Sequence, residues 1–149
     1  MQELTCDLLV IGAGSGGLSV AAGASQMGAD VILLEGHKMG GDCLNYGCVP
    51  SKALLAAAKT AYTQSHASAY GVADQAPVVD YSAAKDHVHD VIATMGRVDR
   101  QERFEGFGVR VVREYGRFVD DRVVEAGAFR ITARRNRLVG EWAAGLMGL

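Results

Sequence analysis

Two cysteines with a short spacing are the residues in this sequence best placed to do chemistry. Cys43 and Cys48 stand at positions i and i+5, and Lys52 follows one helical turn later. In a regular helix the two Cα atoms would lie about 8.7 Å apart, beyond the ~7 Å that a disulfide tolerates. A bridge therefore requires Cys43 to lie outside the regular helix, at an irregular N-terminal turn that Gly41 and Gly47 make easier.

This spacing favours redox chemistry, although it leaves two alternatives open. A helix N-terminus lowers the pKa of a thiol, and a strained, accessible bridge is typically catalytic. Two unbridged buried thiols are one alternative. A zinc site is the other, but it needs four suitably spaced ligands, which Cys6 and His37 do not complete. We therefore expect no metal site, and we expect Cys6 to be an inert packing residue.

A glycine-rich segment near the N-terminus is the second group with chemical potential. Gly12, Gly14 and Gly17 match G-x-G-x-x-G. Glycines at these positions permit a tight turn, the approach of a pyrophosphate to the backbone, and close packing of a helix on a strand. Glu35 follows at the spacing of an acid that accepts hydrogen bonds from ribose hydroxyls. The pattern predicts dinucleotide binding without separating FAD from NAD, and a merely structural turn is the alternative.

The elements around these glycines predict a β-α-β unit. Residues 7–11 and 31–34 are short apolar runs typical of buried strands. A small-residue helix is expected over 18–27, with Gly28 in the C′ position. Short connections of this kind imply parallel strands and a right-handed crossover.

The rest of the chain predicts two helices and then a small antiparallel sheet. One helix is expected over 51–70, and a second over 81–100 with Asp80 as its N-cap. After Gly108 the hydrophobic period shortens, which indicates antiparallel strands. The expected strands span 109–113, 117–119, 122–125 and 129–133, with Asp120-Asp121 at a hairpin tip.

Composition excludes several classes of protein. The chain has 149 residues with 49% hydrophobic and 21% charged side chains, which argues against disorder. A net charge of −2 provides no basic field for nucleic acid or an anionic membrane. Leu8–Ala29 is uncharged, but its glycines divide it into strand, turn and helix rather than a membrane span. Glu3 and Asp7 argue against a secretory leader, so we expect a cytoplasmic protein.

Residues 40–52, Gly-Gly-Asp-Cys-Leu-Asn-Tyr-Gly-Cys-Val-Pro-Ser-Lys, resemble the redox segment of the class I pyridine nucleotide-disulfide oxidoreductases. Residues 103–109 are also similar to the segment after the long helix in mercuric reductase-like members. The resemblance covers about residues 5–135. It implies an α/β fold, namely a Rossmann-like FAD-binding domain with a parallel β-α-β core, a small antiparallel segment and a redox-active disulfide.

The resemblance also implies a role for each motif residue. Cys48 would be the sulfur next to the flavin and form the charge-transfer thiolate, and Cys43 would be the interchange thiol. Lys52 would lie near the flavin ring, and Glu35 would hold the adenosine ribose. Electrons would run from NAD(P)H through FAD to the Cys43–Cys48 bridge and on to a small disulfide or metal-ion substrate. The remaining residues expected to contact FAD are Gly12, Gly14, Ser15, Gly16, Gly17, Gly41, Asp42 and Gly116.

The chain departs from this family near its end. Residues 136–149 do not resemble the apolar strand that closes the FAD domain, so we expect an incomplete domain over 1–135 and a non-family tail. The NAD(P)H domain and the domain that forms the family homodimer would be absent, and the chain alone would be inactive. A non-catalytic flavin-binding remnant and an NAD-binding Rossmann domain are the alternatives.

Overall fold

The computed structural model describes residues 1–134, so the expected tail over 136–149 lies outside the described residues. The chain forms two compact units. Residues 1–41 and 99–134 make up the sheet unit. Asp42–Val98 make up the helical unit.

A parallel three-stranded sheet lies at the centre of the sheet unit. It has the order β2 (Leu8–Ile11), β3 (Val31–Leu34) and β4 (Arg110–Val112), and all its pairings are parallel. Helix α1 (Ser15–Gln26) connects β2 to β3, which confirms the β-α-β unit. Gly28 follows the C-cap with φ of +88°, as expected for a C′ glycine.

The sequence prediction was wrong about β4, which is parallel rather than antiparallel. A short helix that the pattern did not predict, α5 (Gln101–Gly106), precedes this strand. Parallel strands need a crossover connection, and the helical segment that ends in α5 provides one between β3 and β4.

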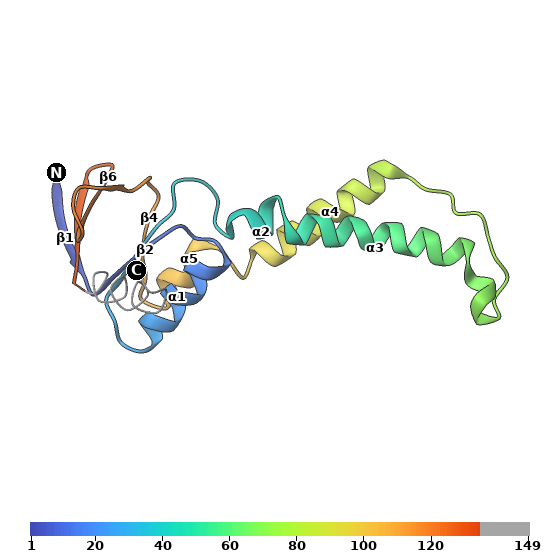
Figure 1. Ribbon diagram of the computed structural model, residues 1–149, viewed down its shortest axis with the longest axis horizontal. Coiled ribbons are helices and arrows are strands. Elements are labelled where there is room, and N and C mark those ends of the chain that lie inside the picture. The colour runs from blue at the N-terminus through green and yellow to red at the C-terminus, as the bar shows by residue number, and fades with distance from the viewer. Residues whose placement is uncertain (135–149) are drawn as a thin grey trace, which may run out of the picture. The chain divides into compact units, whose positions relative to one another are not determined.

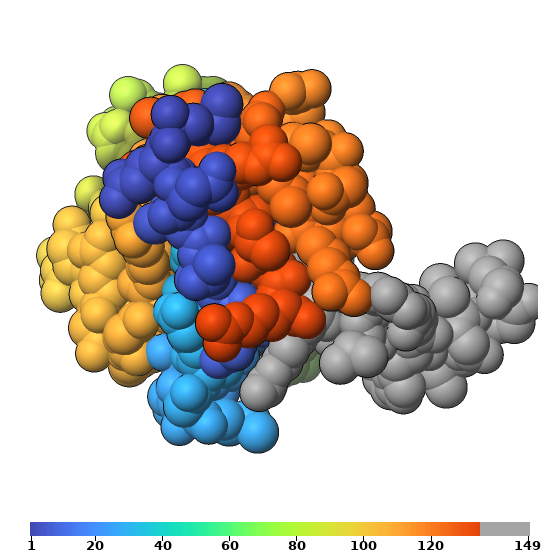
Figure 2. Space-filling view, turned by 90° about the vertical axis from the view of Figure 1, so that its left-hand side faces the viewer, coloured from blue at the N-terminus to red at the C-terminus, as the bar shows by residue number. Residues whose placement is uncertain are grey.

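A second sheet of four strands packs in the same unit. Its order is β1 (Gln2–Cys6), β7 (Phe129–Ala133), β6 (Val123–Ala126) and β5 (Arg117–Phe118). The sequence reading missed β1, which pairs parallel with β7 and brings Leu4 opposite Ile131. Figure 2 shows this N-terminal strand in blue against the red C-terminal strand. The β5–β6–β7 pairings are antiparallel, as expected.

Two hydrophobic clusters divide the sheet unit into three layers. Ile32 and Leu34 face the four-stranded sheet and pack with Cys6 and Ile131. The alternate residues of β3 face α1 and α5. Burial raises the pKa of the Cys6 thiol to about 11, so this thiol stays protonated at neutral pH and packs as an apolar group, as expected.

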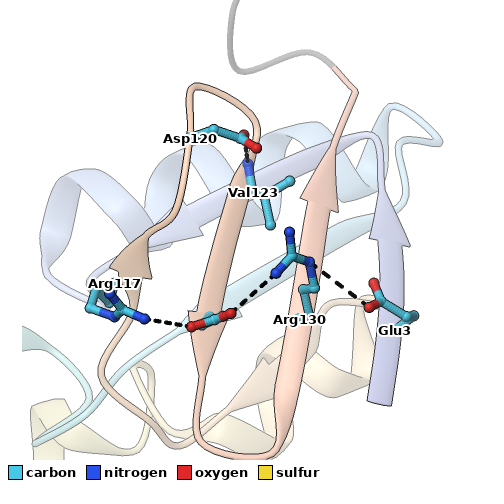
Figure 3. A network of polar contacts seen from close by, with 6 residues as sticks. Glu3, Arg117, Asp120, Val123 and Arg130 are labelled. Atoms are coloured by element: carbon cyan, nitrogen blue, oxygen red, sulfur yellow. Dashed lines mark hydrogen bonds and ion pairs between the residues drawn. The ribbon is translucent and has the colours of Figure 1, made fainter. Parts of the chain in front are cut away.

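An ion-pair network crosses the outer surface of the four-stranded sheet (Figure 3). Arg130 lies 3.9 Å from Glu3 and 3.2 Å from Glu125, and Arg117 lies 2.7 Å from Glu125. At the hairpin tip, Asp120 Oδ1 accepts 2.8 Å hydrogen bonds from the Arg122 and Val123 backbone amides. Exposed ion pairs contribute about 1 kcal/mol or less each, so this network favours the strand register more than it adds stability.

The helical unit begins with two helices separated by a break. They are α2 (Gly41–Asn45) and α3 (Cys48–Ser65), followed by a 3-10 turn over Ala67–Tyr70. Helix α4 (Tyr81–Gly96) packs on α3, and Asp80 caps it by accepting a 3.1 Å hydrogen bond from the Ala83 amide. Figure 1 shows α3 and α4 side by side. Within residues 1–134, no helix is long and apolar enough to cross a membrane.

Candidate functional site

The N-terminus of α1 presents backbone amides at the carboxyl end of β2. Gly14 is the N-cap residue, and no side chain in the described part of the chain caps the helix. Gly12 has φ of +95°, which glycine adopts without strain, and its amide donates to the Leu34 carbonyl at 2.8 Å. The first turn, Ser15-Gly16-Gly17-Leu18, carries no acidic side chain. Amides and the helix dipole together make this turn suitable for an anion.

The glycines of the turn serve two distinct purposes. A Cβ on Gly17 would lie 1.9 Å from the Gly12 carbonyl oxygen, so this glycine is required for helix–strand packing, as expected. A Cβ on Gly14 or Gly16 would meet no atom of the described chain within 4 Å. The surface over Gly14 and Gly16 is therefore open to a ligand.

The Glu35 carboxylate is held by the backbone. Its Oε2 accepts a 2.7 Å hydrogen bond from the Ala13 amide, and its Oε1 accepts one of the same length from the His37 amide. A carboxylate offers about four lone-pair sites, so both oxygens retain capacity for hydroxyl donors. Glu35 thus links the glycine turn to the segment that follows β3.

The next segment of the chain also contacts the glycine turn. The Gly40 amide donates to the Ala13 carbonyl at 2.8 Å, and Gly40 pairs with Gly14 as an isolated β-bridge. Gly41 has φ of +58°, and a Cβ there would lie 2.7 Å from Gly14 Cα. Only glycine therefore fits at position 41 without moving the turn.

The cysteine pair spans the break between α2 and α3. Cys43 lies within α2 and is half-buried, and Cys48 is the exposed first residue of α3; both are free thiols. The Asp42 carbonyl accepts hydrogen bonds from the Tyr46 and Gly47 amides at 2.8 and 2.7 Å, which ends α2. Cys43 therefore lies outside α3, the helix that Cys48 begins, as a bridge between the two would require.

The pKa of the Cys43 thiol is raised in the reduced pair. A hydrogen bond with the Cys48 side chain is the main cause that raises the pKa of the Cys43 thiol, and the nearby Lys52 cation partly lowers it. Cys43 therefore keeps its proton to a higher pH than an ordinary thiol.

We expect the raised pKa of Cys43 to govern its alkylation by iodoacetamide, because only the thiolate reacts. In the reduced chain, the pH midpoint for alkylation of Cys43 should lie above that of an ordinary thiol. In Cys48→Ala it should fall, since the raising contact is lost, whereas in Lys52→Met it should rise. Peptide mass spectrometry over a pH series measures these midpoints, and an unchanged midpoint in Cys48→Ala would contradict the assignment.

The structure brings most of the expected site residues into two groups. One group lies in the sheet unit and contains Gly12, Gly14, Ser15, Gly16, Gly17, Glu35 and Gly41. The other group lies in the helical unit and contains Asp42, Cys43, Cys48 and Lys52. No group of three or more metal-ligating side chains occurs among the described residues.

Gly116 and three residues that the sequence reading missed surround the first group. A Cβ on Gly116 would lie 2.8 Å from Leu34 Cδ1, so this glycine lets the chain pass close to the end of β3. Ala13 and His37 supply the donors to Glu35, and Arg113 contacts the backbone of Glu35. Residue type and spacing could not identify these three residues. Ala13 and His37 act through their backbone amides, and Arg113 contacts a segment that is far away in the sequence.

Comparisons with known proteins found a matching family and several relatives. The family described as "Pyridine nucleotide-disulphide oxidoreductase" matches residues 6–138. A dihydrolipoyl dehydrogenase of Haloferax volcanii is 42% identical over 120 residues, which cover 79% of this chain and 24% of that protein. A mercuric reductase of Bacillus cereus is 30% identical over 87% of this chain and 20% of its own length.

A solved structure shares the fold. It is a Cu(II) complex of the HOCl-induced flavoprotein disulfide reductase RclA from Escherichia coli, which matches 85% of this chain with a TM-score of 0.64 and 20% identity. The match covers 26% of that chain. The present chain therefore spans about a quarter of the length of the relatives it matches.

Proposed function

The chain belongs to the pyridine nucleotide-disulphide oxidoreductase family, and from this premise we propose that it holds FAD and carries the redox-active cysteine pair of a flavin disulfide reductase. Proteins of this family use FAD and NAD(P)H. The observation that carries the proposal is the combination, in one chain, of an uncapped helix beside open glycines and two thiols across a helix break.

The glycine turn has the features that a dinucleotide needs. The amides at the start of α1 would bind the pyrophosphate over Gly14, Ser15 and Gly16, where the surface is open. Glu35, fixed by two amides, would accept hydrogen bonds from the adenosine ribose. By the same resemblance, Gly41, Asp42 and Gly116 would contact the same cofactor.

The cysteines and Lys52 would take part in the transfer of electrons from the flavin to the substrate. Bound FAD takes up a hydride from NAD(P)H and supplies two electrons. With two protons, these electrons reduce a Cys43–Cys48 disulfide to two thiols. Cys48 at the start of α3 is the candidate for the sulfur next to the flavin, and Cys43 is the candidate that attacks the substrate. Lys52 would favour the anionic, reduced cofactor through its charge.

The terminal electron acceptor is a small disulfide or a metal ion in this proposal. The relatives named above include both dihydrolipoyl dehydrogenases and mercuric reductases. We expect a cytoplasmic location, and the homodimer typical of the family would need a domain outside the quarter of the relatives that this chain matches. Because these residues match about a quarter of the relatives, we expect them alone to perform only the flavin and cysteine part of the cycle.

Substituting Gly14 tests the FAD assignment directly. Gly14→Ala should fold normally, since its Cβ meets no described atom within 4 Å and its φ of −77° suits alanine. It should weaken FAD binding at least tenfold, because the new methyl group stands where the pyrophosphate approaches. Flavin fluorescence titration measures the affinity, and thermal unfolding checks the fold.

Gly23→Ala is the matched control for this experiment. It introduces the same methyl group on α1, again with no described neighbour within 4 Å, but far along the helix from the turn. Its FAD affinity should equal that of the unchanged chain. Wild-type protein that binds NADH but not FAD would favour the NAD-binding alternative, and unaltered FAD affinity in Gly14→Ala would refute the placement of the pyrophosphate.

A further inference from the structure

The segment that follows β3, residues 35–37, is held by two side chains from beyond β4. Arg113 Nε donates a 3.2 Å hydrogen bond to the Glu35 carbonyl, and its Nη2 donates to the His37 carbonyl. One guanidinium therefore bridges two carbonyls of the same short segment. We call Arg113, Tyr115 and the segment that they hold the 35–37 clasp.

Tyr115 completes the clasp from the side of Gly36. A Cβ built on Gly36 would lie 2.6, 2.6 and 2.7 Å from three adjacent ring atoms of Tyr115. Nearly equal distances to three contiguous ring atoms mean that the face of the ring covers Gly36. Any larger residue at position 36 would displace the ring, so glycine and tyrosine are matched at this contact.

The 35–37 clasp is connected to the Glu35 carboxylate through the backbone of His37. The His37 amide is one of the two donors that hold this carboxylate, and the His37 carbonyl is one of the two acceptors of Arg113. The other donor, the Ala13 amide, belongs to the glycine turn. Without Arg113, the His37 carbonyl would lose this guanidinium donor, and the peptide that supplies one of the two supports of Glu35 would be held less firmly.

On these contacts we propose that Arg113 is a positioning residue for the adenosine ribose, which it serves by holding Glu35 in place to accept the ribose hydroxyls. The inference rests on the proposed function, since it assumes that Glu35 faces a nucleotide. Arg113 does not touch the ligand in this proposal. The planar guanidinium of arginine can donate to two carbonyls at once, whereas the ammonium group of a lysine is a single point charge.

The experiment compares ADP with 2′,3′-dideoxy-ADP by isothermal titration calorimetry on the full chain. A hydrogen bond to a charged group is worth about tenfold in affinity, so the unchanged chain should prefer ADP by about tenfold. In Arg113→Met this preference should fall to about twofold or less, because the carboxylate is no longer held in place. Arg113→Lys should give an intermediate preference, and it serves as the second variant if Arg113→Met folds poorly.

Arg110→Met is the matched control. Arg110 is the first residue of β4, the strand that precedes Arg113, and its guanidinium lies 5.5 Å from the centre of the Phe129 ring. This variant should keep the full preference for ADP. An equal loss of affinity for both nucleotides in the Arg113 variants, with the preference retained, would overturn the clasp while leaving the proposed function intact. Wild-type protein that binds neither nucleotide would overturn the proposed function, and the clasp with it.

Discussion

Cys48→Ser should abolish the long-wavelength absorption band of the FAD-loaded, dithiol-reduced chain, whereas Cys43→Ser should retain it. The band requires a thiolate against the flavin, and Cys48 is our candidate for that sulfur. Cys48 is exposed at the first residue of an 18-residue helix, where the helix dipole favours an anion. Cys43 has a raised pKa and so favours the neutral thiol.

Long-wavelength absorbance, recorded after anaerobic reduction with a dithiol, provides the measurement. Cys6→Ala is the control for the loss of a thiol as such. Its side chain is 2% exposed and belongs to the core of the sheet unit, so the band should persist once the variant has been loaded with FAD. A band that survives in Cys48→Ser and disappears in Cys43→Ser would reverse the assignment of the two sulfurs.

Local patterns were enough to predict the parts of the fold that are built locally. The run over β2, the glycine turn, α1 and β3 was confirmed because its strands and helix are consecutive and each has its own signal. Spacing alone showed that a bridge would require a break between the cysteines, since a pair at i and i+5 cannot bridge within one regular helix, and the structure has a break between α2 and α3. Gly28 and Asp80 were predicted correctly from the preferences of helix ends.

The missed elements depend on contacts between distant parts of the sequence. Strand β1 is short, with charged and polar residues that alternate with Leu4 and Cys6, and it becomes a strand only because β7 pairs with it. The direction of β4 was wrong for a related reason. A run of alternating residues does not reveal its partner, and Val111 lies opposite Leu33 of the parallel sheet.

The candidate site shows the same division. Sequence reasoning placed Glu35 at the end of the second buried strand, but it could not show that the Ala13 and His37 amides hold its carboxylate. Every residue except proline has a backbone amide, so residue type does not reveal which amides hold the carboxylate. Arg113 was missed because an exposed arginine after a strand is common. Its role depends on hydrogen bonds to two carbonyls that are far away in the sequence.

The second large effect is expected at Gly17, where alanine should destabilise the chain by about 3 kcal/mol. Its Cβ would lie 1.9 Å from the Gly12 carbonyl oxygen and 3.3 Å from Val10 Cγ1. Both neighbours belong to β2 or to the turn that follows it, so the clash cannot be relieved by rotating a flexible side chain. Overpacking of this kind costs about 1–3 kcal/mol, and the backbone contact puts Gly17 at the upper end.

Urea unfolding followed by circular dichroism measures this loss, and Gly23→Ala again supplies the control. At position 23, alanine should stabilise the helix by up to about 1 kcal/mol, because the Cβ is unobstructed and glycine is a poor helix former. Unchanged stability in Gly17→Ala would show that α1 can shift away from β2. The contrast with Gly14→Ala then separates the two uses of glycine in one turn: position 17 controls whether the helix packs, and position 14 controls whether the pyrophosphate can approach.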